Sequence, residues 1–553
     1  MKKYSIAGIG LLCILVIIGC EPKVEVDDPT TNTSEPVDVP TTDPDTIPAA
    51  SFTDSLSVVW EGSTATVSGN VQGVTVTSNS NGYLVITSTV KDVKYLLSGS
   101  GTGQFKLYSD YKYELILNGL TLACSDGAAI NSQSKKKGYV LINGTNSLSD
   151  GSSYAASTED QKAAFFSEGQ LVLSGAGSLN ITGNYKHAIA SDDYIEFAKD
   201  LGTLTLKSAS DGIHANDHLT FRGGTIAITA GSDGIQCDST ITVYGGTITI
   251  TADGDGMQSD TSYIAIAGGC ITVTKAGDKG ITAFGDVIIT DGTIRVTSQY
   301  KCIKAGKKDD SGKVVSAGNL SISGGDIQVI CTGTSTSSGG GPGGRGGSSS
   351  DSSTPEGIEA KGTITISGGN VYAQSSDDAI NAGGDMTISG GCVCAYSTGN
   401  DGLDANGNCY IKGGLIYAIG SRSPEMAIDA NTEGGKKLYV TGGTIVAVGS
   451  LESGAQLSQT CYSASGSAST WYALVVGDDV FAFKTPSSNA GTLVVSGASK
   501  PSLYKSVTPS GTAIFNNMAY YPASYSGGSS VSLSTYSAGS GGGPGGGGGR
   551  PGW

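Results

Sequence analysis

Aspartate recurs at a fixed interval in segment 210–260, which holds three copies of an Asp-Gly step followed by an apolar residue. The three aspartates are Asp211, Asp233 and Asp255, each standing two residues before the apolar position. A second set of acidic or amide residues stands three residues after that position. Carboxylates brought to the same place in successive repeats can bind a hard cation, because calcium takes oxygen ligands at about 2.3–2.6 Å.

The interval of 22 residues implies stacked repeats, which would place the two sets in two files along one edge. Carboxylates about 4.8 Å apart on neighbouring strands repel each other by roughly 3 kcal/mol at an effective dielectric constant near 20. A cation between them would relieve this repulsion. We therefore expect calcium as a cofactor, with these candidate ligands: Asp192, Asp211, Asn216, Asp233, Asp238, Asp255 and Asp260.

A structural turn is the alternative explanation for the first file. Asp-Gly is a favoured turn dipeptide, and an Asp side chain can accept a hydrogen bond from a nearby backbone amide. Turn chemistry accounts less well for the second file. The two explanations stay open at the level of the sequence.

Lysine replaces aspartate in the first file in the next two repeats, at Lys279 and Lys301. A lysine beside calcium could abstract the C5 proton of a uronate, because the metal would lower the pKa of that proton. Alternatively, each lysine supplies positive charge where no metal binds, or is simply solvated at a turn. No complete catalytic motif surrounds either residue, so binding ranks above catalysis.

Sugar contacts are expected from aromatic and polar side chains beside the acidic files. Tyr, Lys and His gather in 183–194, and His or Gln stands between the two files in the following repeats. Such side chains can stack on sugar rings and hydrogen-bond to hydroxyl groups. With only three histidines in the chain, no histidine-based metal site is expected. The candidate sugar-binding residues are Tyr185, Lys186, His187, His214, Gln236 and Gln258.

Short strands must position these side chains. From about 52 to 450, alternating apolar residues and Gly-Gly turns recur with a period near 22, without a helical period of 3.6. Three strands and three turns use one period, which indicates one coil of a solenoid. The predicted fold class is all-β: a right-handed parallel β-helix with ~22-residue coils and a small C-terminal β region.

The N-terminal segment has the pattern of an exported lipoprotein. Residues 1–20 combine a basic start, a short apolar run and Cys20, which we expect to carry lipid. Residues 21–50 are rich in Pro, Thr and Asp and predict a disordered tether. We expect a lipoprotein at the outer membrane or cell surface, in contact with the membrane only through this lipid.

The remaining chain divides into three predicted parts. Residues 51–460 form the β-helix and carbohydrate-binding domain, with a disordered, low-complexity insertion at 332–353. Residues 461–536 form the small C-terminal β region. A flexible Gly-rich tail follows at 537–553.

The formal net charge of −16 argues against a nucleic-acid partner, since phosphate binding needs a basic surface. This charge suits cations or neutral sugars. An anionic polymer could approach only at a local basic patch or through bound metal. We expect a monomer.

Several segments resemble a family of bacterial carbohydrate-binding β-helix proteins, related in fold to pectate and polygalacturonate lyases. They are SGNVQGVTVTSN, YELILNGLTL, INSQSKKK, AAFFSEGQLVLSGAGSLNITGNYKHAIASDDYI and SDGIHANDHL, within a match over roughly 55–450. The resemblance implies a right-handed parallel β-helix, bound calcium and binding of cellulosic or acidic plant polysaccharide. The lyase relatives pair a lysine base with calcium held by aspartate, which suggests Lys279 or Lys301.

We therefore expect a surface-anchored lipoprotein that binds plant-type or acidic polysaccharide through a calcium-stabilised β-helix. A calcium-dependent, polygalacturonate-like lyase with a lysine base is the first alternative. A structural adhesin or envelope protein is the second.

Overall fold

The computed structural model describes residues 51–309, 311–334, 354–423, 425–488 and 490–539. The predicted signal peptide, Cys20 and the tether lie outside these residues, as do most of the insertion at 332–353 and of the Gly-rich tail. No helix within the described ranges has the length and apolarity needed to cross a membrane.

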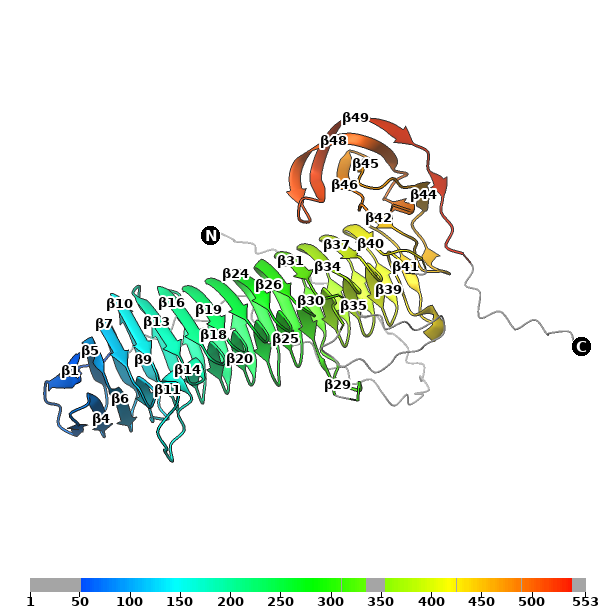
Figure 1. Ribbon diagram of the computed structural model, residues 1–553. Coiled ribbons are helices and arrows are strands. Elements are labelled where there is room, and N and C mark those ends of the chain that lie inside the picture. Colours follow the sequence, from blue (N-terminus) through cyan, green and yellow to red (C-terminus); the bar gives the residue numbers. More distant parts are fainter. Residues whose placement is uncertain (1–50, 310, 335–353, 424, 489, 540–553) are drawn as a thin grey trace, which may run out of the picture. The chain divides into compact units, whose positions relative to one another are not determined.

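Almost all regular structure in the described chain is β-strand (Figure 1). The one helical element in the described ranges is the 3-10 helix η1 (Thr432–Gly434). The strands form a 30-stranded sheet, a 14-stranded sheet, a two-stranded sheet and a closed four-stranded barrel.

The 14-stranded sheet positions the candidate site. Its strands are β3 (Val74–Ser78), β4 (Tyr83–Ser88), β6 (Gln104–Ser109), β8 (Ile130–Ser132), β11 (Ala163–Ser167), β14 (His187–Ser191), β17 (Ile213–Ala215), β20 (Ile235–Cys237), β23 (Met257–Ser259), β25 (Ile281–Ala283), β27 (Ile303–Ala305), β32 (Ile358–Ala360), β35 (Ile380–Ala382) and β38 (Leu403–Ala405).

The 30-stranded sheet supplies the other strands of each repeat and continues beyond them. Its strands are β1 (Asp54–Gly62), β2 (Thr64–Ser68), β5 (Val93–Thr102), β7 (Tyr113–Ala123), β9 (Gly138–Asn143), β10 (Thr145–Ser149), β12 (Leu171–Ser174), β13 (Ser178–Gly183), β15 (Ile195–Phe197), β16 (Thr203–Ser208), β18 (His218–Phe221), β19 (Thr225–Ala230), β21 (Thr240–Val243), β22 (Thr247–Ala252), β24 (Ile264–Ala276), β26 (Val287–Ser298), β30 (Leu320–Ile322), β31 (Asp326–Cys331), β33 (Ile364–Ile366), β34 (Asn370–Ser375), β36 (Met386–Ile388), β37 (Cys392–Ser397), β39 (Cys409–Ile411), β40 (Leu415–Ile419), β41 (Leu438–Val440), β42 (Thr444–Val448), β43 (Gln456–Leu457), β44 (Cys461–Ser465), β47 (Thr492–Ser496) and β50 (Ser534–Thr535).

Two smaller units complete the strand inventory. The two-stranded sheet pairs β28 (Lys307–Lys308) with β29 (Val314–Ser316) in antiparallel fashion. The closed barrel consists of β45 (Trp471–Val476), β46 (Asp479–Lys484), β48 (Ser502–Ile514) and β49 (Ala519–Val531).

Successive repeats pair in parallel and in register. In the 14-stranded sheet, Ile213 pairs with Ile235, Ile235 with Met257, and Met257 with Ile281. We call the region from β5 to β43 the parallel stack. The apolar residues used to align the repeats are therefore neighbours in space, as the sequence predicts. Each is fully buried and contributes about 1.5–3 kcal/mol to the free energy of unfolding.

Glycine pairs form the turns between strands of the parallel stack. Gly246, the second glycine of one pair, has a φ of +92°, a conformation that residues with a Cβ rarely adopt. A Cβ at this position would lie 2.7 Å from the carbonyl oxygen of Gly223 in the preceding repeat. Turn conformation and close stacking both explain why Gly-Gly recurs in the sequence.

The prediction of a right-handed parallel β-helix with a small C-terminal β region requires correction. The chain is all-β, as predicted, but its strands assemble into two large sheets and it includes a closed barrel. Antiparallel pairs such as β1–β2 and β42–β47 also interrupt the parallel order. A sequence period determines which residues fall into register, whereas the closure of strands into sheets or barrels depends on pairing between non-repeating segments.

The barrel and the end of the parallel stack share one apolar cluster. Tyr472, Phe481 and Phe483 fill the barrel, and Tyr417 from β40 packs against Phe483 with ring centroids 5.4 Å apart. The hydroxyl of Tyr417 donates a hydrogen bond to the backbone oxygen of Lys484 at 2.8 Å. This cluster joins the barrel to the stack.

Candidate functional site

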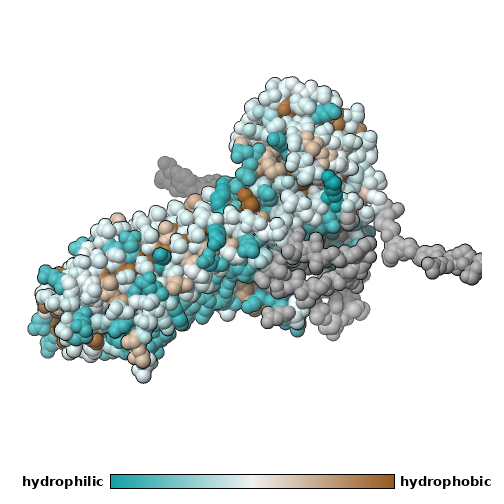
Figure 2. Space-filling model, in the orientation of Figure 1, coloured by the Kyte–Doolittle hydropathy of each residue, from teal (hydrophilic) through white to brown (hydrophobic). Residues whose placement is uncertain are grey.

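Polar and ionisable side chains form two columns along the 14-stranded sheet from β14 to β38. We call the residues two positions before each aligned apolar residue the turn column: His187, Asp211, Asp233, Asp255, Lys279, Lys301, Glu356, Asp378 and Asp401. We call the central residues of the same strands the strand column: Ala190, His214, Gln236, Gln258, Thr282, Lys304, Glu359, Asn381 and Asp404. Figure 2 shows hydrophilic surface, in teal, along the lower edge of the stack.

The turn column is held by a ladder of hydrogen bonds between repeats. Oδ1 of Asp211 accepts the backbone N–H of Asp233 at 3.2 Å, and Oδ1 of Asp233 accepts that of Asp255 at 2.7 Å. Oδ1 of Asp255 then accepts the backbone N–H of Lys279 at 2.7 Å. Each carboxylate thus satisfies an amide of the next repeat, which supports the turn explanation for these three residues.

Carboxylates of the ladder differ in their ionisation. Burial first, and then the charges of Asp255 and Asp211, raise the pKa of Asp233 to about 7. Burial also opposes ionisation of Asp211, but hydrogen bonds from His187 and His214 outweigh it and hold the pKa of Asp211 well below its usual range. The ladder therefore carries one firmly ionised carboxylate beside one that binds a proton near neutral pH.

Substitutions at Asp233 distinguish a role in the hydrogen-bond ladder from a role as a calcium ligand. Asp233→Asn keeps an acceptor for the backbone amide of Asp255 and removes a negative charge that neighbouring carboxylates repel. With metal ions removed by a chelator, we therefore expect this variant to be at least as stable as wild type at pH ~8. Asp233→Ala leaves that amide unpaired and should cost about 1–3 kcal/mol. Urea unfolding compares the three proteins. Equal losses in both variants would contradict the ladder.

The seven predicted calcium ligands fall into separate groups. Asp192 forms an ion pair with Lys162 at 2.7 Å, and Nδ2 of Asn216 donates to Oδ1 of Asp192 at 3.4 Å. Asp260 accepts hydrogen bonds from Gln236, at 2.6 Å, and from Gln258. Asp238 lies beside the strand that carries Gln236.

These groups do not converge on one oxygen-rich centre. Of the seven, only Asp211 belongs to a described group of three side chains whose metal-capable atoms lie within 4.8 Å of one another, and its partners there are two histidines. Calcium favours six to eight oxygen ligands. The seven residues therefore do not fit a single calcium site, and calcium binding remains a prediction.

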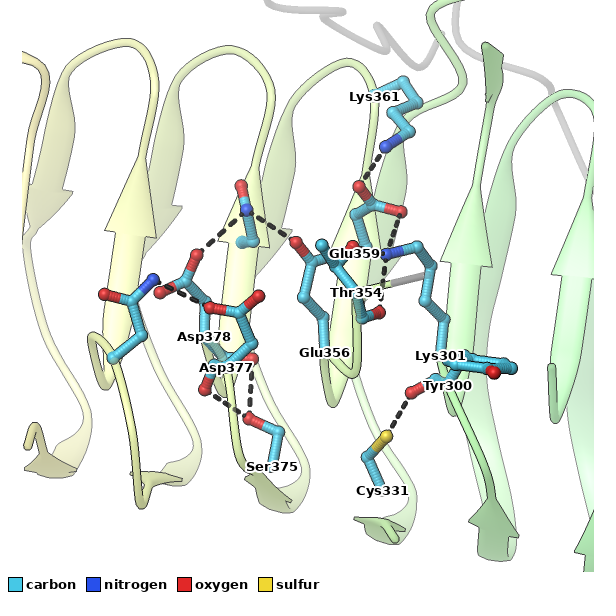
Figure 3. Close-up of polar contacts among 12 residues, drawn as sticks. Tyr300, Lys301, Cys331, Thr354, Glu356, Glu359, Lys361, Ser375, Asp377 and Asp378 are labelled. Atoms are coloured by element: carbon cyan, nitrogen blue, oxygen red, sulfur yellow. Dashed lines mark hydrogen bonds and ion pairs between the residues drawn. The ribbon is translucent and has the colours of Figure 1, made fainter. Parts of the chain in front are cut away.

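Lys301, one of the two predicted catalytic lysines, is fully buried (Figure 3). Its Nζ lies 2.8 Å from a carboxylate oxygen of Glu356 and 3.5 Å from one of Glu359. It also donates to Oγ1 of Thr354 at 2.6 Å. A polymer in solution cannot reach this ammonium, so its position is structural rather than catalytic.

Lys279 remains accessible at the edge of the sheet. Its side chain is 14 % exposed and lies 2.6 Å from Asp278 and 3.7 Å from Asp255. It lines a cavity of about 220 Å³. Of the two predicted lysines, only Lys279 is placed where a polysaccharide could touch it.

This cavity gathers four lysines, and we call it the lysine cleft. It spans β23, β25, β27 and β28, and its lining residues are Asp255, Gln258, Ser259, Asp260, Lys279, Thr282, Ala283, Phe284, Lys304, Gly306, Lys307, Lys308 and Asp309. Antiparallel pairing of β28 with β29 fixes the backbone that carries Lys307 and Lys308. Three lysines within KAGKK (304–308) are a basic run in an acidic chain, and this signal could have located the cleft.

The six predicted sugar-binding residues occupy different surroundings. Tyr185 stacks on Tyr154 with ring centroids 4.2 Å apart, and the ammonium of Lys186 lies 5.6 Å from the centre of the Tyr185 ring. His187 and His214 contact Asp211. Gln236 and Gln258 both donate to Asp260, and of the six only Gln258 lines the lysine cleft.

A second acidic group lies at the far end of the columns. Asp401, Asp404 and Asp429 bring their carboxylate oxygens within 4.8 Å of one another. Burial first, and then the charge of Asp404, raise the pKa of Asp401 to about 7. Oδ1 of Asp401 accepts the backbone N–H of Met426.

Asp401→Asn should make the protein less sensitive to alkali. Between about pH 4, near the pKa of an unfolded Asp, and about pH 7, folded wild type binds a proton that the unfolded chain has released, so its stability falls as the pH rises. Asn keeps the acceptor for Met426 and has no such proton. Thermal unfolding across this range should show a smaller decline for the variant, and identical profiles would contradict the assignment.

Comparison with known proteins places most of this sheet within one family. A family model described as "Carbohydrate-binding domain-containing protein" matches residues 80–283, 201–340 and 278–402. Together the matches span 80–402, more than half of the 553 residues, and include the whole lysine cleft. None of the curated proteins matches the chain.

One similar solved structure is that of a polysaccharide lyase-like protein from C. thermocellum, in a gadolinium derivative. Its sequence is 25 % identical, and the alignment covers 42 % of this chain and 96 % of that chain, with a TM-score of 0.38.

Proposed function

Because the chain belongs to the family of carbohydrate-binding domain-containing proteins, we propose that it binds an acidic polysaccharide at the lysine cleft. The observation that carries this proposal is that four lysines and three carboxylates line one cavity in a chain with a formal net charge of −16. Lys304 is buried, so the lysines that a polymer can reach are Lys279, Lys307 and Lys308. The overall charge repels an anionic polymer, so binding requires a local basic surface such as this one.

The lining of the cleft suits the repeating chemistry of a uronate chain. Lysine ammonium groups donate charge-assisted hydrogen bonds to carboxylates. Gln258 and Thr282 offer polar atoms for hydroxyl groups, and Phe284 offers an apolar ring face. At about 220 Å³ the cleft is smaller than a typical ligand pocket of ~300–1,000 Å³, which favours contact with a short stretch of a longer polymer.

Catalysis by the lyase mechanism receives less support than binding. A general base must be uncharged to accept a proton. The carboxylates of Asp278 and Asp255, at 2.6 and 3.7 Å, stabilise the charged ammonium of Lys279. We therefore assign Lys279 a role in binding the polysaccharide rather than in catalysis.

The proposal also includes calcium binding and a lipid anchor, which are independent of each other and of the lysine cleft. The excess of carboxylates supports an affinity for calcium, and the pattern that ends at Cys20 supports lipidation and display at the cell surface. Adding calcium to chelated protein should raise the melting temperature if calcium binds the folded state. An unchanged melting temperature would contradict the calcium step alone.

Affinity electrophoresis through gels that contain dissolved polysaccharide tests the binding proposal. Polygalacturonate should retard the protein at low salt and retard it less at high salt, because exposed charges are screened. A neutral soluble cellulose derivative should retard it weakly. Equal retardation by both polymers would overturn the preference for acidic chains, and absence of binding to either would favour the adhesin alternative. Appearance of an unsaturated, ultraviolet-absorbing product would favour the lyase.

A further inference from the structure

Two of the three histidines in the chain converge on a single carboxylate. Nδ1 of His187 lies 3.1 Å from Oδ2 of Asp211, and Nδ1 of His214 lies 3.5 Å from the same oxygen. The metal-capable atoms of these three residues all lie within 4.8 Å of one another. The group is separate from the lysine cleft, since none of its members lines that cavity.

Stacked repeats bring these residues together. His187 stands in the turn column on β14, Asp211 follows it in the next repeat, and His214 stands in the strand column on β17. The two imidazole rings stack with centroids 4.5 Å apart and an interplanar angle of 18°. Both Nδ1 atoms lie within 3.5 Å of the same carboxylate oxygen of Asp211. Because the lone pairs of nearly parallel rings point in parallel directions, a shared ion requires one of the two rings to turn toward the other.

The donor spacing matches that of one small tetrahedral ion. Bonds of about 2.0–2.1 Å to a tetrahedral zinc ion place neighbouring ligand atoms roughly 3.3 Å apart. The two nitrogen–oxygen separations, 3.1 and 3.5 Å, bracket this value. Nδ1 of His214 donates a hydrogen bond to Oε1 of Gln236 at 2.6 Å, and an arriving ion would displace this hydrogen bond and its proton.

Donor chemistry favours a transition metal over calcium. Two imidazole nitrogens and one carboxylate suit zinc, copper or nickel, whereas calcium prefers oxygen donors throughout. Nδ1 of His187 accepts the backbone N–H of Asp211 at 3.3 Å, so this nitrogen carries the lone pair that a metal ligand needs. The His214 side chain is 14 % exposed and leaves a route for an ion from solvent.

We infer that His187, Asp211 and His214 form a binding site for a divalent transition metal of the zinc class. The sequence alone predicts no histidine-based site, because the chain has only three histidines, and two of these, His187 and His214, are 27 positions apart. Strand stacking brings them together. Asp211 takes part through Oδ2 while its Oδ1 continues the ladder to Asp233.

Calorimetric titration of chelated protein with zinc chloride tests this site. Wild type should bind one equivalent, and His187→Gln and His214→Gln should each weaken binding by at least about tenfold, as losses around metal sites do. His218→Gln is the matched control, because His218 is the third histidine and lies outside the group, beside Asp217 and Tyr194. It should bind zinc as wild type does.

A second variant and a second readout separate metal binding from folding. Asp211→Asn keeps a ladder acceptor and removes the ligand charge, so it should fold normally and bind zinc more weakly. Cobalt(II) should give visible absorption bands of a tetrahedral centre in wild type and in His218→Gln only. Zinc affinity that is unchanged in His187→Gln and His214→Gln, or absent in wild type, would overturn the inference.

Discussion

Lys301→Met should lower the free energy of unfolding by about 3–5 kcal/mol, because it leaves buried carboxylates without their counter-charge. The side chain of Lys301 is 0 % exposed, and its ammonium lies 2.8 Å from Glu356 and 3.5 Å from Glu359. Figure 3 shows this ammonium among the carboxylates and Thr354. Methionine has a similar volume, so the lost charge rather than a cavity accounts for the effect.

The size of the loss should depend on pH. Burial first, and then the charge of Glu359, raise the pKa of Glu356 to about 7, against the opposing charge of Lys301. Without Lys301 this pKa should rise further above the ~4.3 of an unfolded Glu. Since a raised pKa in the folded state costs stability as the pH increases, the variant should suffer most above about pH 7.

Urea unfolding measures this effect against a matched control. Lys275 forms an ion pair with Asp253 at 2.8 Å, but its side chain is 61 % exposed, so Lys275→Met should cost less than about 1 kcal/mol. Lys301→Met combined with Glu356→Gln should recover part of the loss, because it removes both members of the pair. A loss at Lys301 no larger than that at Lys275 would contradict the structural role.

Lys307→Ala combined with Lys308→Ala should weaken binding to polygalacturonate by about 100-fold. Each lysine lines the lysine cleft, and a hydrogen bond to a charged group is worth about 1.5–3 kcal/mol, or roughly tenfold in affinity. Both residues lie in the short strand β28 at the surface rather than in the apolar core. The variant should therefore fold as wild type does.

A control with the same loss of charge distinguishes a site from a general charge effect. Lys275 and Lys412 are both exposed and lie outside the cleft. Lys275→Ala combined with Lys412→Ala should change the affinity by less than about tenfold, because these charges act only over distance. Equal losses in the two double variants, measured by affinity electrophoresis, would show that binding follows net charge and would contradict the cleft.

Register was the most predictable feature of this fold. Ile213, Ile235 and Met257 align by spacing alone and are paired in the structure, because a regular repeat stacks equivalent residues. The barrel could not be predicted from that period. Its segment 471–531 contains two 13-residue strands, β48 and β49, whose pairing depends on contacts that do not repeat.

The roles of site residues could be predicted only where a local sequence pattern indicates them. The family resemblance read from the sequence is confirmed by the family match. The Asp-Gly steps located the ladder, but the sequence could not show that each carboxylate accepts an amide from the next repeat. Lys301 shares its column with Lys279, yet Thr354, 53 positions later, covers it. Burial of this kind arises from long-range packing and leaves no local signal.

Hydrogen–deuterium exchange with an oligogalacturonate tests the central claim most directly, because it locates the bound sugar on the folded chain. The lysine cleft predicts slower exchange in segments 279–284 and 304–309, and unchanged exchange in the barrel strands β45 and β46. Protection confined to 185–214 or to the barrel, with none in the two cleft segments, would contradict the claim that the lysine cleft binds acidic polysaccharide.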